Sequence, residues 1–165
     1  LSQNYRLTGA GDNIWFDSDA FYFVYRRMAG DFSLSAHFEL GSLPADPLRK
    51  TGWMIRTSLA HDAQHASAVL HGDGLTLLQW RPGKGNRMKS PQHELYAPEA
   101  HYQTLKLKRS GAHISMYAAK GSGEAVHVGT HQLVGLPDTV FVGLLVCSHQ
   151  PDTIATAIVS EVQIE

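Results

Sequence analysis

Four polar side chains with strong hydrogen-bonding capacity occur in three segments whose residues alternate between apolar and polar. They are Arg56, Gln79, Arg81 and His149. This alternation is typical of β-strands with one face in a core, and it places the four side chains on the opposite, open face. Their donors and acceptors suit sugar hydroxyls or the carboxylate of a uronic acid. The alternative is that Arg56 and Arg81 pair with Asp or Glu neighbours on a solvated face.

The three tryptophans supply flat rings of the kind that cover the apolar face of a sugar. Trp15 lies in a loop rich in Asp, Asn and Gly, where an indole is hard to bury, so it either lines a ligand face or plugs one end of the fold. Trp53 and Trp80 alternate in step with Ile55 and Leu78, which predicts that both are core residues. The predicted ligand-binding residues are therefore Trp15, Arg56, Gln79, Arg81 and His149.

The sequence predicts no catalytic residue. Glycoside hydrolysis uses two facing carboxylates, roughly 5 to 9.5 Å apart. Most carboxylates of this chain fall in predicted turns, and Glu39, inside a predicted strand, has no evident partner. Neither a GxSxG nor an HExxH motif is present in the sequence.

No metal site is predicted either. His61 and His65 are four residues apart, but they lie in a predicted loop and not on a helix, which disfavours zinc. Calcium needs several converging oxygen atoms. Such oxygens are offered near the N-terminus by Asp12, Asn13, Asp17 and Asp19. Calcium is thus the one cofactor that the sequence leaves open.

The elements that would position these residues are short strands separated by turn-forming residues. Residues 32–40 show the clearest alternation. Further strands are predicted at 21–26, 51–57, 66–71, 75–81, 104–109, 113–119, 126–133, 139–147 and 154–164. Only 14–18 and 60–65 have room for a helical turn, and the long irregular stretch 82–101 is suited to rim a binding face. The pattern predicts an all-β sandwich or barrel in a single domain, residues 1–165.

Composition excludes several classes of partner. The 165 residues carry a formal net charge of -1, so no field attracts nucleic acid or an anionic membrane. No apolar run approaches the roughly 20 residues of a membrane-spanning helix. The single cysteine, Cys147, excludes an intrachain disulfide and is predicted to be a structural thiol.

Several motifs, in order along nearly the whole chain, resemble one family. They are residues 11–15, 19–25, 28–32, 50–56, 78–81, 105–111 and 136–144, followed by Ser148-His149. The chain resembles the DUF1349-like domains, once labelled "regulation of enolase" proteins. The resemblance implies a concanavalin A-like jelly roll of two antiparallel sheets. It also implies an oligo- or polysaccharide ligand, an attached catalytic or propeller domain, and a secreted or periplasmic location.

The leading hypothesis is a non-catalytic carbohydrate-binding or accessory domain of a bacterial polysaccharide-utilisation protein. One alternative is a sugar-acting hydrolase or lyase, with His149 as the base and Arg56 stabilising developing negative charge. Another is a structural domain that packs on a glycosidase or propeller partner and binds no sugar.

Overall fold

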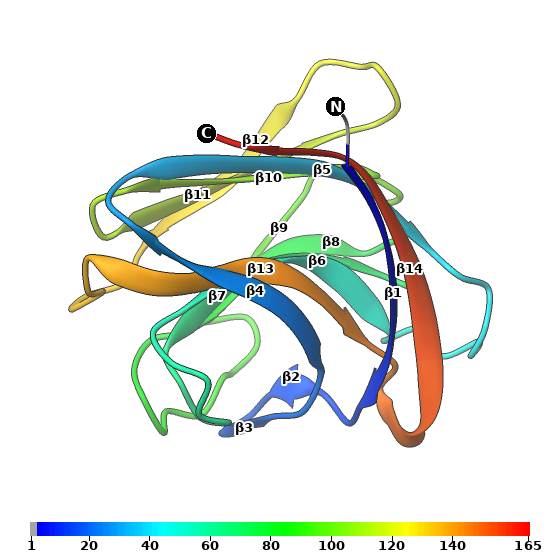
Figure 1. The fold of residues 1–165 in the computed structure, drawn as a ribbon, viewed down its shortest axis with the longest axis horizontal. Coiled ribbons are helices and arrows are strands. Elements are labelled where there is room, and N and C mark those ends of the chain that lie inside the picture. The colour runs from blue at the N-terminus through cyan, green and yellow to red at the C-terminus, as the bar shows by residue number, and fades with distance from the viewer. Residues whose placement is uncertain (1–2) are drawn as a thin grey trace.

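The computed structural model describes residues 3–165, which form two six-stranded antiparallel sheets and a short hairpin (Figure 1). The first sheet contains, in spatial order, β1 (Gln3–Gly11), β14 (Gln150–Ile164), β5 (Phe32–Leu40), β10 (Thr104–Ser110), β11 (His113–Ala119) and β12 (Val126–Gln132). The second contains β4 (Tyr22–Ala29), β13 (Thr139–Cys147), β6 (Lys50–Arg56), β7 (His65–His71), β8 (Thr76–Arg81) and β9 (Glu94–Tyr96). The hairpin joins β2 (Ile14–Trp15) to β3 (Ser18–Asp19).

Each predicted strand is present, with its ends shifted by a few residues. Four strands in stretches without a clear alternation were not predicted, namely β1, β2, β3 and β9. The segment 14–18, a candidate helical turn in the sequence, forms most of the hairpin instead. No helix among residues 3–165 is long and apolar enough to cross a membrane.

The main core fills the space between the two sheets. The even-numbered residues of β5 from Phe32 to Phe38 point into it and are buried, as the alternation predicts. Trp53 and Trp80 face them from the second sheet with 1% and 5% of their surface exposed, which confirms that both are core residues. The indole nitrogen of Trp53 donates to the carbonyl oxygen of Leu105 in the first sheet, at 3.2 Å. The apolar core between the two sheets therefore holds them together as a sandwich.

The outer face of the second sheet, which alternation predicts to be open, is covered. Every residue of β6, β7 and β8 is buried, whichever face of the sheet its side chain points to. A small apolar cluster that includes Ile14, Met54 and Leu145 lies on this outer face. Figure 1 shows the cause: the β2–β3 hairpin lies beneath the second sheet, on the side away from the first. The expectation of an exposed polar face is therefore wrong.

The first and last strands, β1 and β14, pair with each other in the first sheet. Gln3 of β1 pairs with Val162 of β14. The start of β1 and the end of β14 lie at the top of Figure 1, and the hairpin lies at the bottom. The hairpin is thus on the opposite side of the sandwich from the start of β1 and the end of β14.

Candidate functional site

A single buried carboxylate holds the hairpin against the second sheet. Asp19, at the end of β3, accepts hydrogen bonds from Nη1 and Nη2 of Arg81 at 2.6 and 2.7 Å. Nη1 of Arg56 donates to the same carboxylate at 3.2 Å. Burial alone raises the pKa of Asp19, but the Arg81 hydrogen bonds and the nearby cations outweigh it, and the pKa lies below its ordinary value. Asp19 is therefore ionised at neutral pH.

The remaining donors of the two arginines bind backbone carbonyls of the covering loops. Nη2 of Arg81 donates to the carbonyl oxygen of Phe16 at 3.1 Å, and its Nε donates to that of Asn86 at 2.9 Å. Arg56 donates in the same way to Ser58 at 2.8 Å and to Ala60 at 2.5 Å. These bonds fix the hairpin and the loops 57–64 and 82–93 to the sheet. The alternative considered for the arginines, pairing with a carboxylate, is what the structure contains, although the pair is buried and not solvated.

Gln79 lies under the same cover. Its side-chain nitrogen donates to the carbonyl oxygen of Ile14 at 3.3 Å, and 1% of its surface is exposed. Arg56 and Arg81 are 2% and 0% exposed. Three of the five predicted ligand-binding residues are thus buried beneath the hairpin, where they position the loops around them.

Other polar groups of this outer face are also buried. Nζ of Lys50 donates to Oδ1 of Asn13 at 2.9 Å, and burial lowers the pKa of Lys50. Nδ1 of His65 lies 3.0 Å from Oγ of Ser67, and neither ring nitrogen of His71 has a hydrogen-bond partner among residues 3–165. Burial lowers the pKa of each histidine to about 3, so both are neutral at physiological pH.

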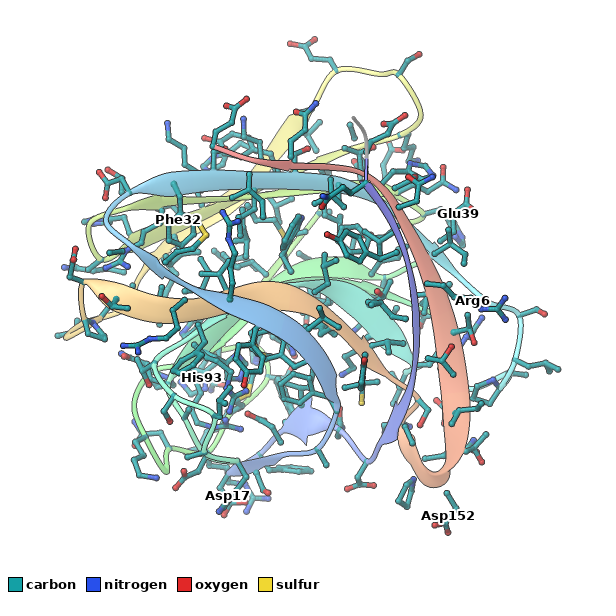
Figure 2. All side chains as sticks on the ribbon, viewed as in Figure 1. Arg6, Asp17, Phe32, Glu39, His93 and Asp152 are labelled. Atoms are coloured by element: carbon teal, nitrogen blue, oxygen red, sulfur yellow. The ribbon has the colours of Figure 1, made fainter. Side chains whose placement is uncertain are left out.

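The other two predicted residues, Trp15 and His149, come together at the surface. They line a pocket of about 340 Å³, which we call the Trp15 pocket. Its other lining residues are Asp12, Asn13, Phe16, Asp17 and Ser18. Figure 2 shows Asp17 at the bottom of the molecule, below the two sheets. The pocket combines two aromatic rings with carboxylate, amide, hydroxyl and imidazole groups.

Two strained residues shape this pocket. Phe16 and His149 have backbone φ angles of 49° and 66°, in the left-handed region that bulky residues rarely adopt. Phe16 is 49% exposed, its ring meets that of Trp15 edge to face at 6.4 Å, and the guanidinium of Arg87 lies 4.6 Å from its centroid. Strained backbone of this kind is concentrated at binding and active sites. The Phe16 ring is thus exposed beside the half-buried Trp15, on a strained backbone.

His149 is oriented by a carboxylate from a distant loop. Its Nδ1 lies 3.0 Å from Oδ2 of Asp46. Burial is the largest single influence on the pKa of Asp46 and raises it, but the hydrogen bonds from His149, the Leu48 backbone and Gln150 together outweigh it, and the pKa is lowered. Because Nδ1 faces a carboxylate, which only accepts, Nδ1 is the donor of this hydrogen bond. Asp46 was not identified from the sequence, since it lies 103 residues before its partner.

The structure separates His149 from the arginines. Cys147, two residues before His149, pairs with Lys50, whereas Arg56 pairs with Phe141. Cys147 lies six residues after Phe141 along an extended strand, a span of about 20 Å. The sequence-based grouping of His149 with Arg56, Gln79 and Arg81 on one face is therefore wrong, and so is the arrangement of His149 beside Arg56 that an enzyme would use.

Two of the four residues considered for calcium have their oxygen atoms engaged by other groups. Oδ1 of Asn13 accepts from the backbone nitrogen of Ile14 and from Lys50, and the Asp19 carboxylate is held by two arginines. Asp12 and Asp17 line the Trp15 pocket. Among residues 3–165, no group of three or more His, Cys, Asp or Glu side chains is placed to hold a metal ion.

The two sheets form an all-β, concanavalin A-like jelly-roll sandwich. No model of a known protein family matches the chain, and no curated protein matches it. Solved structures do. A protein of unknown function from Saccharomyces cerevisiae has a TM-score of 0.71 at 14% identity, with 98% of this chain and 87% of that chain covered.

Two bacterial structures share the fold as well. The carbohydrate binding module CBM66 from Bacillus subtilis has a TM-score of 0.60 at 16% identity, with 97% of this chain and 94% of that chain covered. A mutant of the GH43 protein BlXynB from Bacillus licheniformis has a TM-score of 0.66 at 13% identity. The match covers 98% of this chain but 32% of the GH43 chain, so this chain resembles one part of that protein. At these identities the likeness concerns the fold alone.

Proposed function

We propose that this protein is a non-catalytic carbohydrate-binding or accessory domain, which binds an oligo- or polysaccharide in the Trp15 pocket. The observation that carries the proposal is the pair of adjacent aromatic rings, Trp15 and Phe16, held at the surface among polar side chains. An aromatic ring covers the apolar C–H face of a sugar, while planar polar groups bind the hydroxyls at its edge.

The polar groups of the pocket match sugar hydroxyls. Asp12 and Asp17 supply carboxylate oxygens that accept from hydroxyl groups, and His149 supplies an imidazole ring held by Asp46. The orientation of the pocket walls is fixed before a ligand arrives, because Arg81 binds the carbonyl of Phe16 and Asp46 binds His149. A preformed site loses less entropy on binding than a mobile one.

The comparisons agree with this proposal at the level of the fold. One of the similar structures is a carbohydrate binding module, and another contains the fold as part of a GH43 protein. The proposal also includes three points that the sequence resemblance supports. They are kinship with the DUF1349-like domains, an attached catalytic or propeller domain, and a secreted or periplasmic location.

Binding to a panel of plant, algal and host polysaccharides, followed by calorimetry on soluble oligosaccharides, tests the proposal. Trp15→Ala is expected to weaken the affinity by about tenfold or more, because the stacking ring is lost, and Trp15→Phe is expected to weaken it less. Tyr96→Ala is the matched control, since Tyr96 is an exposed aromatic residue of β9 outside the pocket. Absence of binding across the panel, or an unchanged affinity in Trp15→Ala, would contradict the proposal.

A further inference from the structure

A second pocket lies next to the Trp15 pocket, on the outer face of the edge strand β4. It has a volume of about 200 Å³, and we call it the Tyr25 pocket. Its side walls are formed by Phe21, Phe23 and Tyr25 and by Leu59 and His61. Asp19 and Arg56, whose side chains are almost fully buried, also line it. Like the first pocket, it therefore combines aromatic rings with polar groups.

The three aromatic residues form a row along one face of β4 and the residue before it. The ring centroids of Phe21 and Phe23 are 5.5 Å apart. The rings of Phe23 and Tyr25 are stacked, with their centroids 5.3 Å apart. Phe21 and Phe23 pack against the apolar cluster of the outer face, which fixes the row in place. Tyr25, at its end, is 46% exposed and offers its ring to a ligand.

The opposite wall is held rigidly by Arg56. The guanidinium of Arg56 lies 5.3 Å from the centroid of Phe21, and its bonds to the carbonyls of Ser58 and Ala60 fix the loop 57–64. Leu59, in this loop, is 51% exposed. The pocket is thus an open and preformed space between a strand and a loop that the buried ion pair holds in position.

The two pockets share one wall. Trp15 pairs with Ser18 across the hairpin, and Oγ of Ser18 lies 3.2 Å from Nδ1 of His61. Ser18 lines the Trp15 pocket and His61 lines the Tyr25 pocket. The backbone nitrogen of Asp19 also donates to the carbonyl of His61, at 2.7 Å. A narrow polar ridge therefore separates two pockets that each have an aromatic wall.

We propose that the Trp15 and Tyr25 pockets are two subsites for a single sugar chain, so that the ligand of this domain is an oligosaccharide segment and not an isolated sugar. This inference rests on the proposed function. Each unit of a glycan has an apolar ring face and polar hydroxyl groups at its edge. Each of the two pockets, on either side of the Ser18–His61 ridge, has an aromatic wall and polar groups that match one such unit. A protein partner would instead need a contact surface of about 1,000 Å² or more with an apolar centre.

Calorimetry on a length series tests this inference. The probes are xylo-oligosaccharides and β-1,3-gluco-oligosaccharides, each from the monosaccharide to the hexasaccharide, together with the oligosaccharides of any polysaccharide that binds in the panel above. The affinity of the wild-type protein is expected to rise by about tenfold once the chain is long enough to reach the second pocket. Tyr25→Ala is expected to remove this gain and to leave the affinity for the shortest ligand that binds unchanged. Leu59→Ala, on the opposite wall, is expected to reduce the gain.

Tyr22→Ala is the matched control. Tyr22 lies on the same strand as Tyr25, on its opposite face, and is 44% exposed. Its replacement is expected to leave the dependence on chain length intact. If the affinity does not depend on length, or if Tyr25→Ala binds the long chains as tightly as the wild type, the inference is overturned while the proposed function stands. If no probe binds to the wild type, both are overturned.

Discussion

The two faces of the second sheet are both buried, but by different means. Its inner face is apolar and packs against the first sheet through residues such as Trp53, Ile55, Ala68, Leu78 and Trp80. Its outer face carries charged and polar residues under the hairpin and loops, namely Lys50, Arg56, His65, Gln79 and Arg81. The inner face is stabilised by removal of apolar surface from water. The outer face adds to its small apolar cluster a set of hydrogen bonds that replace those with water.

The outer face depends on the residues that cover it. Buried cations are tolerated when a carboxylate and several carbonyl oxygens satisfy them, and here Asp19 and the loop backbone supply both. A polar strand face is therefore no evidence of exposure, because a short segment from elsewhere in the chain can neutralise it. The predictions below test this difference between the two faces.

Loss of the carboxylate should have the largest effect. Asp19→Ala leaves Arg56 and Arg81 buried without a counter-ion, and the free energy of unfolding is expected to fall by about 3 to 5 kcal/mol in denaturant titration. Asp19→Asn, which keeps an oxygen acceptor, is expected to lose less and provides a folded variant if the first does not fold. Lys84→Met, which removes an exposed ion pair with Asp62, is the control and should change stability by about 1 kcal/mol or less. Equal effects of Asp19→Ala and Lys84→Met would show that the buried ion pair is not essential.

A cavity in the inner core should have a comparable or slightly smaller effect. Leu34 of β5 is fully buried between the sheets, so Leu34→Ala is expected to lower the free energy of unfolding by about 2 to 5 kcal/mol. Because this core is remote from the hairpin, the variant should keep the affinity of the Trp15 pocket per folded molecule. A neutral effect on stability would contradict the assignment of this strand face to the core.

The buried histidines predict a smaller dependence on pH. The pKa of His71 is about 3 in the folded protein and near 6.5 in the unfolded chain. Between pH 6.5 and 3, the unfolded state therefore binds a proton on His71 that the folded state does not bind. Stability is therefore highest above pH 6.5 and falls as the pH drops toward 3, by about 1.4 kcal/mol per pH unit for this group. His65 should behave in the same way. Thermal unfolding between pH 7 and 4.5 measures the slope.

His71→Phe isolates the contribution of one ring. This variant is expected to reduce the slope by about 1.4 kcal/mol per pH unit, and at neutral pH to be at least as stable as the wild type, because both ring nitrogens of His71 are buried without partners. An unchanged slope would mean that His71 is accessible to protons in the folded state.

The architecture was largely predictable because it follows from alternation. β5 places Phe32, Leu34 and Phe38 on one face in both the sequence pattern and the structure. β1 was not predicted, since within Gln3–Gly11 only Leu7 and Gly9 are buried, too few to give a period. The covering of the outer face could not be predicted either, because Asp19 lies 37 and 62 residues from the arginines that it binds.

The candidate site was predictable only in part. Trp15 was identified from the composition of its loop. Phe16 and Asp17, which follow it in the sequence and line the same pocket, could have been added to the predicted site because they belong to the same loop. His149 was identified with the wrong neighbours, because its partner Asp46 is set by the tertiary fold. The left-handed backbone of Phe16 and His149 has no signature in their residue types.

The pairing of β1 with β14 has a practical consequence for how this domain can be held. Both strands reach the side of the sandwich opposite Asp17 and the hairpin, as Figures 1 and 2 show. A peptide added at either end and captured on a bead or sensor therefore leaves the Trp15 pocket pointing into solution. The immobilised protein should retain the affinity of the free one, whichever end carries the anchor.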